Sequence, residues 1–144
     1  MSKSRSLAGL RIGYALGSET LIATLEAVKN SYNSYTMDAV ALAAGEAAVK
    51  DEAYFQETCR KVIATRERTA DELRKLGFTV SPSLTNFLFV THPTQKAPEI
   101  FEFLRQKNIF IRYFKLPRID NYLRITIGTD EQMDRMIEEL RTFL

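Results

Sequence analysis

The sequence predicts an α/β fold in which helices pack on a small, mainly antiparallel sheet. Of the 144 residues, 45% are hydrophobic and 26% are charged, which is typical of a globular protein with one ordinary core. From residue 52 onward, short runs of β-branched and aromatic residues alternate with segments of helical periodicity. Turn-forming sequences such as Ser81-Pro82-Ser83 separate neighbouring runs.

Residues 1–50 predict one strand and two helices. A strand is expected over residues 10–16, where β-branched and aromatic side chains lie between two glycines. Ser18 is expected to cap a helix that ends near residue 30, and an alanine-rich helix is expected over about residues 37–49. We interpret residues 1–50 as a segment separate from the domain that follows, whose strand and helices pack against another part of the protein.

A long charged helix is predicted over residues 51–77. Gly77 follows a basic last turn and suits the position just after a helix C-terminus. The helix carries a run of charges that we interpret as a solvated face with i,i+4 ion pairs, namely Glu57, Arg60, Lys61, Arg66, Glu67, Arg68 and Asp71.

Residues 51–144 are predicted to form one compact domain. Its strands are expected at residues 78–80, 86–91, 109–114 and 122–127. Pro98 suits the first turn of a helix, and Thr129 with Gln132 predicts a capping box for the last helix.

Charge and cysteine content exclude several classes of protein. The net charge is +2, from 20 basic and 18 acidic residues, so nothing indicates a nucleic-acid or membrane partner. The single cysteine, Cys59, excludes an internal disulfide framework and fits a reducing compartment. No apolar stretch approaches the roughly 18 residues of a membrane span. No cluster of metal-ligand residues is present. We therefore expect a cytoplasmic protein.

The segment that contains Ser2, Lys3 and Arg11 predicts a cofactor site. Lys3 precedes Arg11 by eight residues. A lysine amine can form a Schiff base with an aldehyde, while a serine hydroxyl and a guanidinium can bind phosphate. This spacing suits a cofactor that has both an aldehyde and a phosphate. Taken alone, Lys3 is more simply a solvated charge near a terminus, and Arg11 an exposed arginine at the start of a strand.

Arg124 is a second candidate, because it interrupts an apolar strand. Alternation places Leu123, Ile125 and Ile127 on one face, and Arg124 and Thr126 on the other. A charge in this position needs a partner or a ligand. The simpler interpretation is an arginine on the exposed face of the sheet.

These residues lie in a sequence that resembles a known enzyme family. The segment SKSRSLAGLRIGY resembles the lysine segment of fold-type-I pyridoxal-phosphate aminotransferases. Its LAGLR portion looks most like the histidinol-phosphate aminotransferase branch. The resemblance continues, in the same order, through Ser31-Tyr32-Asn33, residues 86–90, Ile111-Arg112 and residues 123–129. It therefore covers essentially the whole chain.

The resemblance implies a role for each candidate residue. Lys3 would be the Schiff-base lysine that also moves a proton between the substrate α-carbon and the cofactor. Ser2 and Arg11 would bind the phosphate of pyridoxal 5'-phosphate, and Arg124 would bind the substrate α-carboxylate. Arg112 is a candidate for the phosphate end of the substrate, and its role stays open.

The resemblance also implies an incomplete site. The family needs about twice this length, so we expect a C-terminal portion, with residues 1–50 from the large cofactor domain and residues 51–144 as the small domain. The aspartate and the aromatic residue that hold the cofactor ring would lie outside it. The isolated chain is therefore expected to be inactive and without cofactor. The parent enzyme would act on amino-acid and keto-acid substrates as a homodimer.

Other functions remain open at this stage. Arg11 and Arg124 would serve an aromatic aminotransferase or a threonine-phosphate decarboxylase equally well. A non-catalytic, self-associating α/β module is the alternative from a different class.

Overall fold

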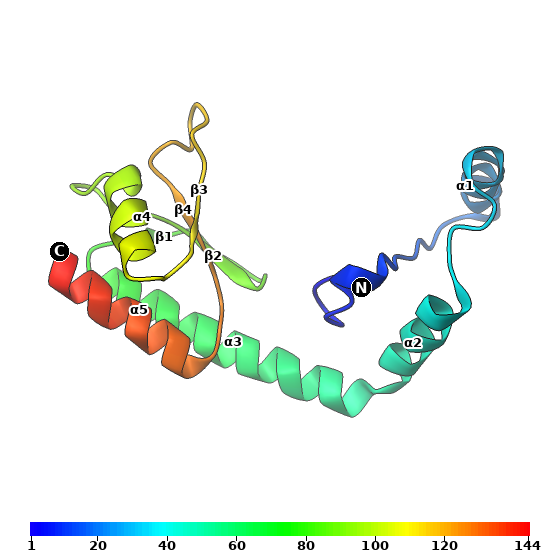
Figure 1. Ribbon diagram of the computed structural model, residues 1–144, viewed down its shortest axis with the longest axis horizontal. Coiled ribbons are helices and arrows are strands. Elements are labelled where there is room, and N and C mark those ends of the chain that lie inside the picture. The colour runs from blue at the N-terminus through cyan, green and yellow to red at the C-terminus, as the bar shows by residue number, and fades with distance from the viewer. The chain divides into compact units, whose positions relative to one another are not determined.

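The computed structural model describes residues 1–144, which form two compact units, 1–59 and 60–144. The division falls within helix α3 (Glu52–Lys75), which contributes to both units (Figure 1). The assignment of residues 1–50 to a larger domain stays a prediction. No helix combines the length and the apolar character that crossing a membrane requires.

In the first unit, the chain begins with turns and a short 3-10 helix, η1 (Ala8–Leu10), and continues into α1 (Glu19–Tyr32) and α2 (Ala39–Lys50). Helix α2 begins at Asp38, whose Oδ1 accepts a hydrogen bond of 2.7 Å from the backbone N–H of Ala41. The predicted alanine-rich helix is thus confirmed.

Packing in the first unit depends on small side chains of α2. Ala41 and Gly45 are the buried residues of this helix. A Cβ atom at Gly45 would lie 3.1 Å from Cδ1 of Ile12, so the glycine lets Ile12 approach the helix backbone. This contact ties the segment that follows η1 to α2.

The strand predicted over residues 10–16 is wrong. The chain has no regular secondary structure between η1 and α1, and it pairs with no strand. Arg11 has a left-handed backbone with φ of 55°, and Tyr14 and Leu16 are 76% and 90% exposed. A strand requires hydrogen bonds from a neighbouring strand, which local composition cannot supply.

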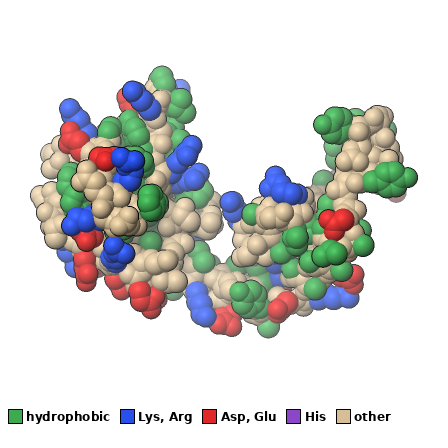
Figure 2. Space-filling view, in the orientation of Figure 1, with side chains coloured by type: hydrophobic (Ala, Val, Ile, Leu, Met, Phe, Trp, Pro, Cys, Tyr) green, Lys and Arg blue, Asp and Glu red, His purple; other side chains and the backbone are tan.

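Helix α1 confirms the helix predicted after Ser18. Its apolar side chains, however, do not pack against another element of the unit. Ser18 occupies the N-cap position, although its side chain makes no capping hydrogen bond. The helix has no buried residue, and its apolar side chains Leu21, Leu25 and Val28 are 63%, 54% and 63% exposed. Figure 2 shows hydrophobic side chains on the surface of this helix. The amphipathic pattern therefore has no partner within the unit.

The second unit confirms the predicted α/β fold. Its four-stranded sheet has the order β1-β2-β4-β3, and every neighbouring pair is antiparallel. The strands are β1 (Thr79–Val80), β2 (Phe87–Thr91), β3 (Arg112–Tyr113) and β4 (Leu123–Thr126). Strand β3 is shorter than the predicted 109–114, and at the start of that range the N–H of Ile109 instead bonds to the carbonyl of Leu104, which closes the preceding helix.

Helices cover one face of this sheet. Helix α4 (Ala97–Gln106), α5 (Asp130–Phe143) and the C-terminal part of α3 enclose a single core with the inward side chains of β2 and β4 (Figure 1). The core includes Leu73, Leu88, Val90, Ile100, Leu104, Leu123, Ile125, Met136 and Leu140.

Two predicted helix ends are confirmed by their geometry. The Thr129 side chain accepts from the Gln132 N–H, and the Gln132 side chain accepts from the Thr129 N–H, so α5 begins with a capping box. Gly77 follows α3 with φ of 89°, a conformation that favours glycine.

The charged run in α3 is only partly a solvated face. Arg68 is paired with Asp130 at 2.8 Å and with Asp134, so it links α3 to α5. Arg66 is 5% exposed, which contradicts the solvated position predicted for it. Helical spacing alone does not reveal that a loop from elsewhere covers this side chain.

Candidate active site

The outer face of the sheet carries the strongest candidate site. Alternation along β2 and β4 buries Leu88, Val90, Leu123 and Ile125 under the helices. The predicted alternation of β4 is confirmed. Arg124 consequently lies on the face away from the core.

Arg124 lies close to two aromatic rings. Its Cζ atom is 5.5 Å from the ring centroid of Phe87 and 5.7 Å from that of Phe114. Rings at this distance stabilise a cation without using its N–H groups. The Nε atom of Arg124 is buried and has no hydrogen-bond partner. A buried donor without a partner is unfavourable, so this unpaired donor marks Arg124 as a cation that its own fold does not neutralise.

Arg112 lies beside Arg124. The two residues are Cα partners in the pairing of β3 with β4. Arg112 is exposed, and its Cζ atom is 5.4 Å from the ring of Phe114. Directly opposed side chains on neighbouring strands lie close together. The arrangement places two permanent positive charges around one aromatic ring, which favours an anion between or beside them.

An aromatic wall continues along the same face. Phe89 is the Cα partner of Arg124 on β2, and its ring stacks on Tyr122 with centroids 4.7 Å apart. Both residues border an open groove of about 520 Å³, which Ser81, Leu116, Pro117, Arg118 and Ile119 also line. The arginines therefore lie next to a surface that can contact an apolar or aromatic group.

The predicted cofactor residues Ser2 and Lys3 lie in a series of tight turns. Ser2 is half-buried and Lys3 is exposed. The carbonyl of Lys3 accepts a hydrogen bond of 3.2 Å from the N–H of Ser6, which has a left-handed backbone with φ of 55°. The turns hold the backbone of Lys3 while its amine reaches the surface.

Arg11 ends η1 instead of beginning a strand. Its Nη1 donates a hydrogen bond of 3.1 Å to the carbonyl of Ala8, three residues earlier. The Nη2 and Nε groups remain to bind an anion, and the side chain is exposed. Arg11 thus keeps the donors that a phosphate needs.

Arg5 is a structurally important residue that sequence reasoning missed. Its Nη2 lies 3.0 Å from Oε2 of Glu52, its Nη1 donates to the carbonyl of Asp51, and its guanidinium lies 3.8 Å from the ring centroid of Phe55. Hydrogen bonds from Gln56 and then Arg5 lower the pKa of Glu52. Arg5 therefore fastens the Lys3 segment to the start of α3. Its only sequence signal was its place two residues after Lys3.

The chain matches one protein family over nearly its whole length. The family model for aminotransferase class I and II matches residues 1–140. The chain belongs to this family.

The most similar relatives include two histidinol-phosphate aminotransferases. The protein from Acinetobacter baylyi is 55% identical over 143 residues, which cover 99% of this chain and 40% of that protein. The protein from Clostridium acetobutylicum is 53% identical over 141 residues, which cover 98% of this chain and 40% of that protein. The chain thus spans about 40% of the length of these curated relatives.

A solved structure supports the same grouping. Histidinol-phosphate aminotransferase from Sinorhizobium meliloti, in complex with pyridoxal-5'-phosphate, superposes with a TM-score of 0.83 at 30% sequence identity. The match covers 99% of this chain and 40% of that chain. The family is pyridoxal-phosphate-dependent.

Proposed function

We propose that the complete protein containing this chain is a histidinol-phosphate aminotransferase of histidine biosynthesis. It would transfer an amino group between glutamate and imidazole-acetol phosphate. The observation that carries the proposal is the guanidinium of Arg124, whose Nε is buried without a hydrogen-bond partner and whose Cζ lies 5.5 and 5.7 Å from the ring centroids of Phe87 and Phe114. The names of the relatives at 55% and 53% identity support the choice of substrate.

The N-terminal residues have the donor set that pyridoxal phosphate requires. Lys3 offers an exposed amine for the aldehyde, and Ser2 and Arg11 offer a hydroxyl and guanidinium N–H groups for the phosphate. When bound, the cofactor supplies an electron sink for the carbanion formed at the substrate α-carbon. We propose that the protein binds it through these three residues.

Lys3 would move the proton at the substrate α-carbon. A free lysine has a pKa of about 10.4, so a proton-transferring lysine needs burial or a nearby cation that lowers the pKa toward neutrality. Lys3 is exposed in this chain. We propose that the enclosing pocket comes from the part of the relatives' length that this chain does not span.

The two arginines of the sheet would recognise the anionic groups of the substrates. Arg124 would bind the α-carboxylate of glutamate, because its planar guanidinium can donate two parallel hydrogen bonds to two oxygens. Histidinol phosphate has a phosphate in place of that carboxylate, and Arg112, which is exposed and pairs with Arg124 across the strands, would help to bind it. Glutamate, whose distal group is a carboxylate, would use the same pair.

Substrate assays on the product of the complete reading frame test this proposal. With 2-oxoglutarate as acceptor, we expect turnover of histidinol phosphate to exceed that of phenylalanine, and no decarboxylation of threonine phosphate. Dominant activity with phenylalanine or with threonine phosphate would replace the proposed substrate. The complete protein is also proposed to be cytoplasmic and homodimeric, and sedimentation of the same sample would test the homodimer.

A further inference from the structure

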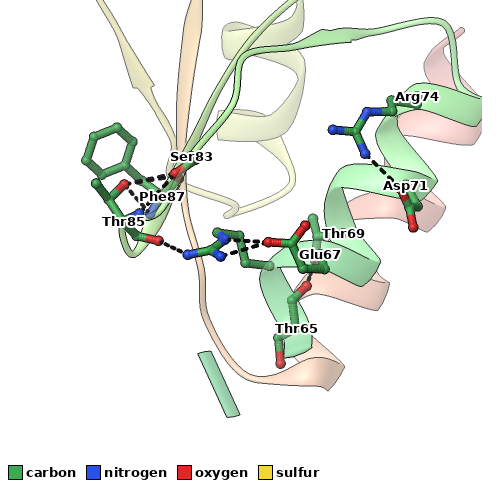
Figure 3. Close-up of polar contacts among 9 residues, drawn as sticks. Thr65, Glu67, Thr69, Asp71, Arg74, Ser83, Thr85 and Phe87 are labelled. Carbon is green, nitrogen blue, oxygen red and sulfur yellow. Dashed lines mark hydrogen bonds and ion pairs between the residues drawn. The ribbon is translucent and has the colours of Figure 1, made fainter. Parts of the chain in front are cut away.

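A buried arginine of α3 is connected to the Arg124 site through a turn. The side chain of Arg66 is 6% exposed. Its Nε and Nη2 both donate to Oε1 of Glu67, at 3.0 and 2.7 Å, and its Nη1 donates to the backbone carbonyl of Thr85 at 3.0 Å. Figure 3 labels the two acceptor residues, Glu67 and Thr85, and marks these hydrogen bonds with dashed lines. Burial of a charge is costly, so this arrangement points to a specific use of the arginine.

The turn that Arg66 holds is itself tightly connected to Phe87. The Ser83 hydroxyl donates to the carbonyl of Phe87 at 2.6 Å and accepts from the N–H of Thr85 at 3.2 Å. The Thr85 hydroxyl donates to the same carbonyl at 3.2 Å (Figure 3). The backbone of Phe87 is therefore held by the turn that precedes it, and the turn is held by Arg66.

Phe87 in turn forms one wall of the anion site. Its ring centroid is 5.5 Å from Cζ of Arg124, and its backbone pairs with Thr126 on β4. The contacts therefore run from Arg66 through the Thr85 carbonyl and Phe87 to the guanidinium of Arg124. A displacement of Phe87 would change the orientation of that guanidinium.

We propose that Arg66 is a positioning residue for anion recognition by Arg124. The inference rests on the proposed function, because it assumes that Arg124 binds the substrate carboxylate. Arg66 is buried and each of its three guanidinium nitrogens donates to Glu67 or Thr85, so its role is to hold the turn and not to bind the ligand. It fixes the turn so that the ring of Phe87 keeps Arg124 oriented toward the ligand. A simple stabilising role would instead affect unfolding and leave anion affinity unchanged.

The test is an NMR titration of the 144-residue chain with succinate, a dicarboxylate without reactive groups. The Nε–H signal of Arg124, assigned by its loss in Arg124→Lys, reports both binding and orientation. Arg66→Met and Ser83→Ala break the chain of contacts at two separate points. Arg74→Met is the matched control, because Arg74 lies on the same helix and pairs only with Asp71 on the surface (Figure 3).

We expect Arg66→Met and Ser83→Ala each to raise the Kd for succinate by about fivefold or more, because a small misplacement of a binding group weakens its interactions strongly. Each variant should also shift the Arg124 signal in the free protein. Arg74→Met should leave both unchanged. An unchanged Kd in folded Arg66→Met would overturn the inference, even if its midpoint of thermal unfolding falls. If Arg66→Met does not fold, an unchanged Kd in Ser83→Ala overturns it. If Arg124→Lys binds succinate with the same Kd as the unmodified chain, Arg124 is not the anion-binding residue. That result would refute the proposed role of Arg124 and, with it, the role of Arg66.

Discussion

Arg112 and Arg124 lie directly opposite each other on neighbouring antiparallel strands, and both guanidinium groups lie within 6 Å of the ring centroid of Phe114, at 5.4 and 5.7 Å. Two cations on opposed positions repel each other in the absence of a ligand. The Phe114 ring offsets part of this repulsion, and an anion would offset more. The pair therefore couples the stability of this edge of the sheet to the binding of an anion.

Arg112→Gln tests this coupling between stability and anion binding. Arg112→Gln should weaken binding of histidinol phosphate by the complete protein by about tenfold, which corresponds to about 1.4 kcal/mol. The ligand-free chain should be equally stable or slightly more stable, because the substitution removes a like-charge contact. Substrate titration and thermal unfolding on one preparation measure both effects. If Arg112→Gln lowers the free energy of unfolding of the ligand-free chain by as much as it lowers the binding free energy, Arg112 has a structural role.

Arg124→Lys tests the neighbouring residue. Lysine keeps the charge but loses the planar fork, so amino-acid substrates should bind more weakly by about 1.5–3 kcal/mol, the value of a charged hydrogen bond. Binding of pyridoxal phosphate should stay the same. Arg105→Lys, on the exposed surface of α4 where Arg105 pairs with Glu102, is the control for an arginine-to-lysine change. Equal losses of cofactor and substrate affinity would contradict the proposed role.

Gly77→Ala should destabilise the second unit. Gly77 has φ of 89°, and an added Cβ atom would lie 3.0 Å from Nε2 of His92. A side chain in a left-handed conformation costs about 1–2 kcal/mol, before any displacement of the histidine. Urea unfolding measures the change. Gly13→Ala is the matched control, because no atom lies within 4 Å of its Cβ position, and an equal effect in both variants would refute the explanation.

The contact between Arg68 and Asp130 predicts a pH dependence. Hydrogen bonds from Arg68 and then Thr65 hold the pKa of Asp130 below its usual value. A carboxylate whose pKa is lower in the folded chain stabilises the fold above its unfolded pKa of about 4, and this stabilisation is lost as the pH falls through the folded pKa. Both side chains are largely exposed, so the effect is small.

Asp130→Asn should therefore lower the midpoint of thermal unfolding at pH 7, and the difference should disappear in strong acid. Asp71→Asn, which removes an ion pair within α3 and not between helices, should have a smaller effect at neutral pH. A difference that stays constant down to strong acid would show that the carboxylate charge does not matter.

The exposed apolar surface of the first unit predicts self-association of the chain. Leu16 is 90% exposed, and α1 exposes Leu21, Leu25 and Val28. Exposed apolar surface is stabilised by burial against another protein surface, and a second copy of the chain can provide that surface. We expect a homodimer or a swapped assembly in which residues 1–50 of one copy cover those of another.

Light scattering at micromolar concentration measures this association. Leu21→Ser combined with Leu25→Ser should shift the chain toward the monomer, whereas Leu84→Ser, at a leucine that is 94% exposed in the second unit, should not. A strict monomer in which residues 1–35 resist proteolysis would instead indicate a self-contained fold.

Local chemistry explains which elements could be predicted from the sequence. The capping box of Thr129 and Gln132 and the helix stop at Gly77 depend on residues a few positions apart. Alternation along residues 122–127 also placed Arg124 on the face away from the core. These features need no knowledge of distant segments, because the backbone geometry of a helix or strand already sets them.

The tertiary structure alone decided the features that depend on distant segments. Residues 10–16 have strand-like composition, yet they form no strand, because pairing needs a partner that composition does not specify. Arg66 has the spacing of a solvated helix face, yet the carbonyl of Thr85 meets it across the fold. The sequence by itself determined that Arg124 would be an isolated cation on an apolar strand. Only strand pairing and the following loop brought Phe87, Phe114 and Arg112 around it, because contacts between segments far apart in the chain depend on how the whole core packs.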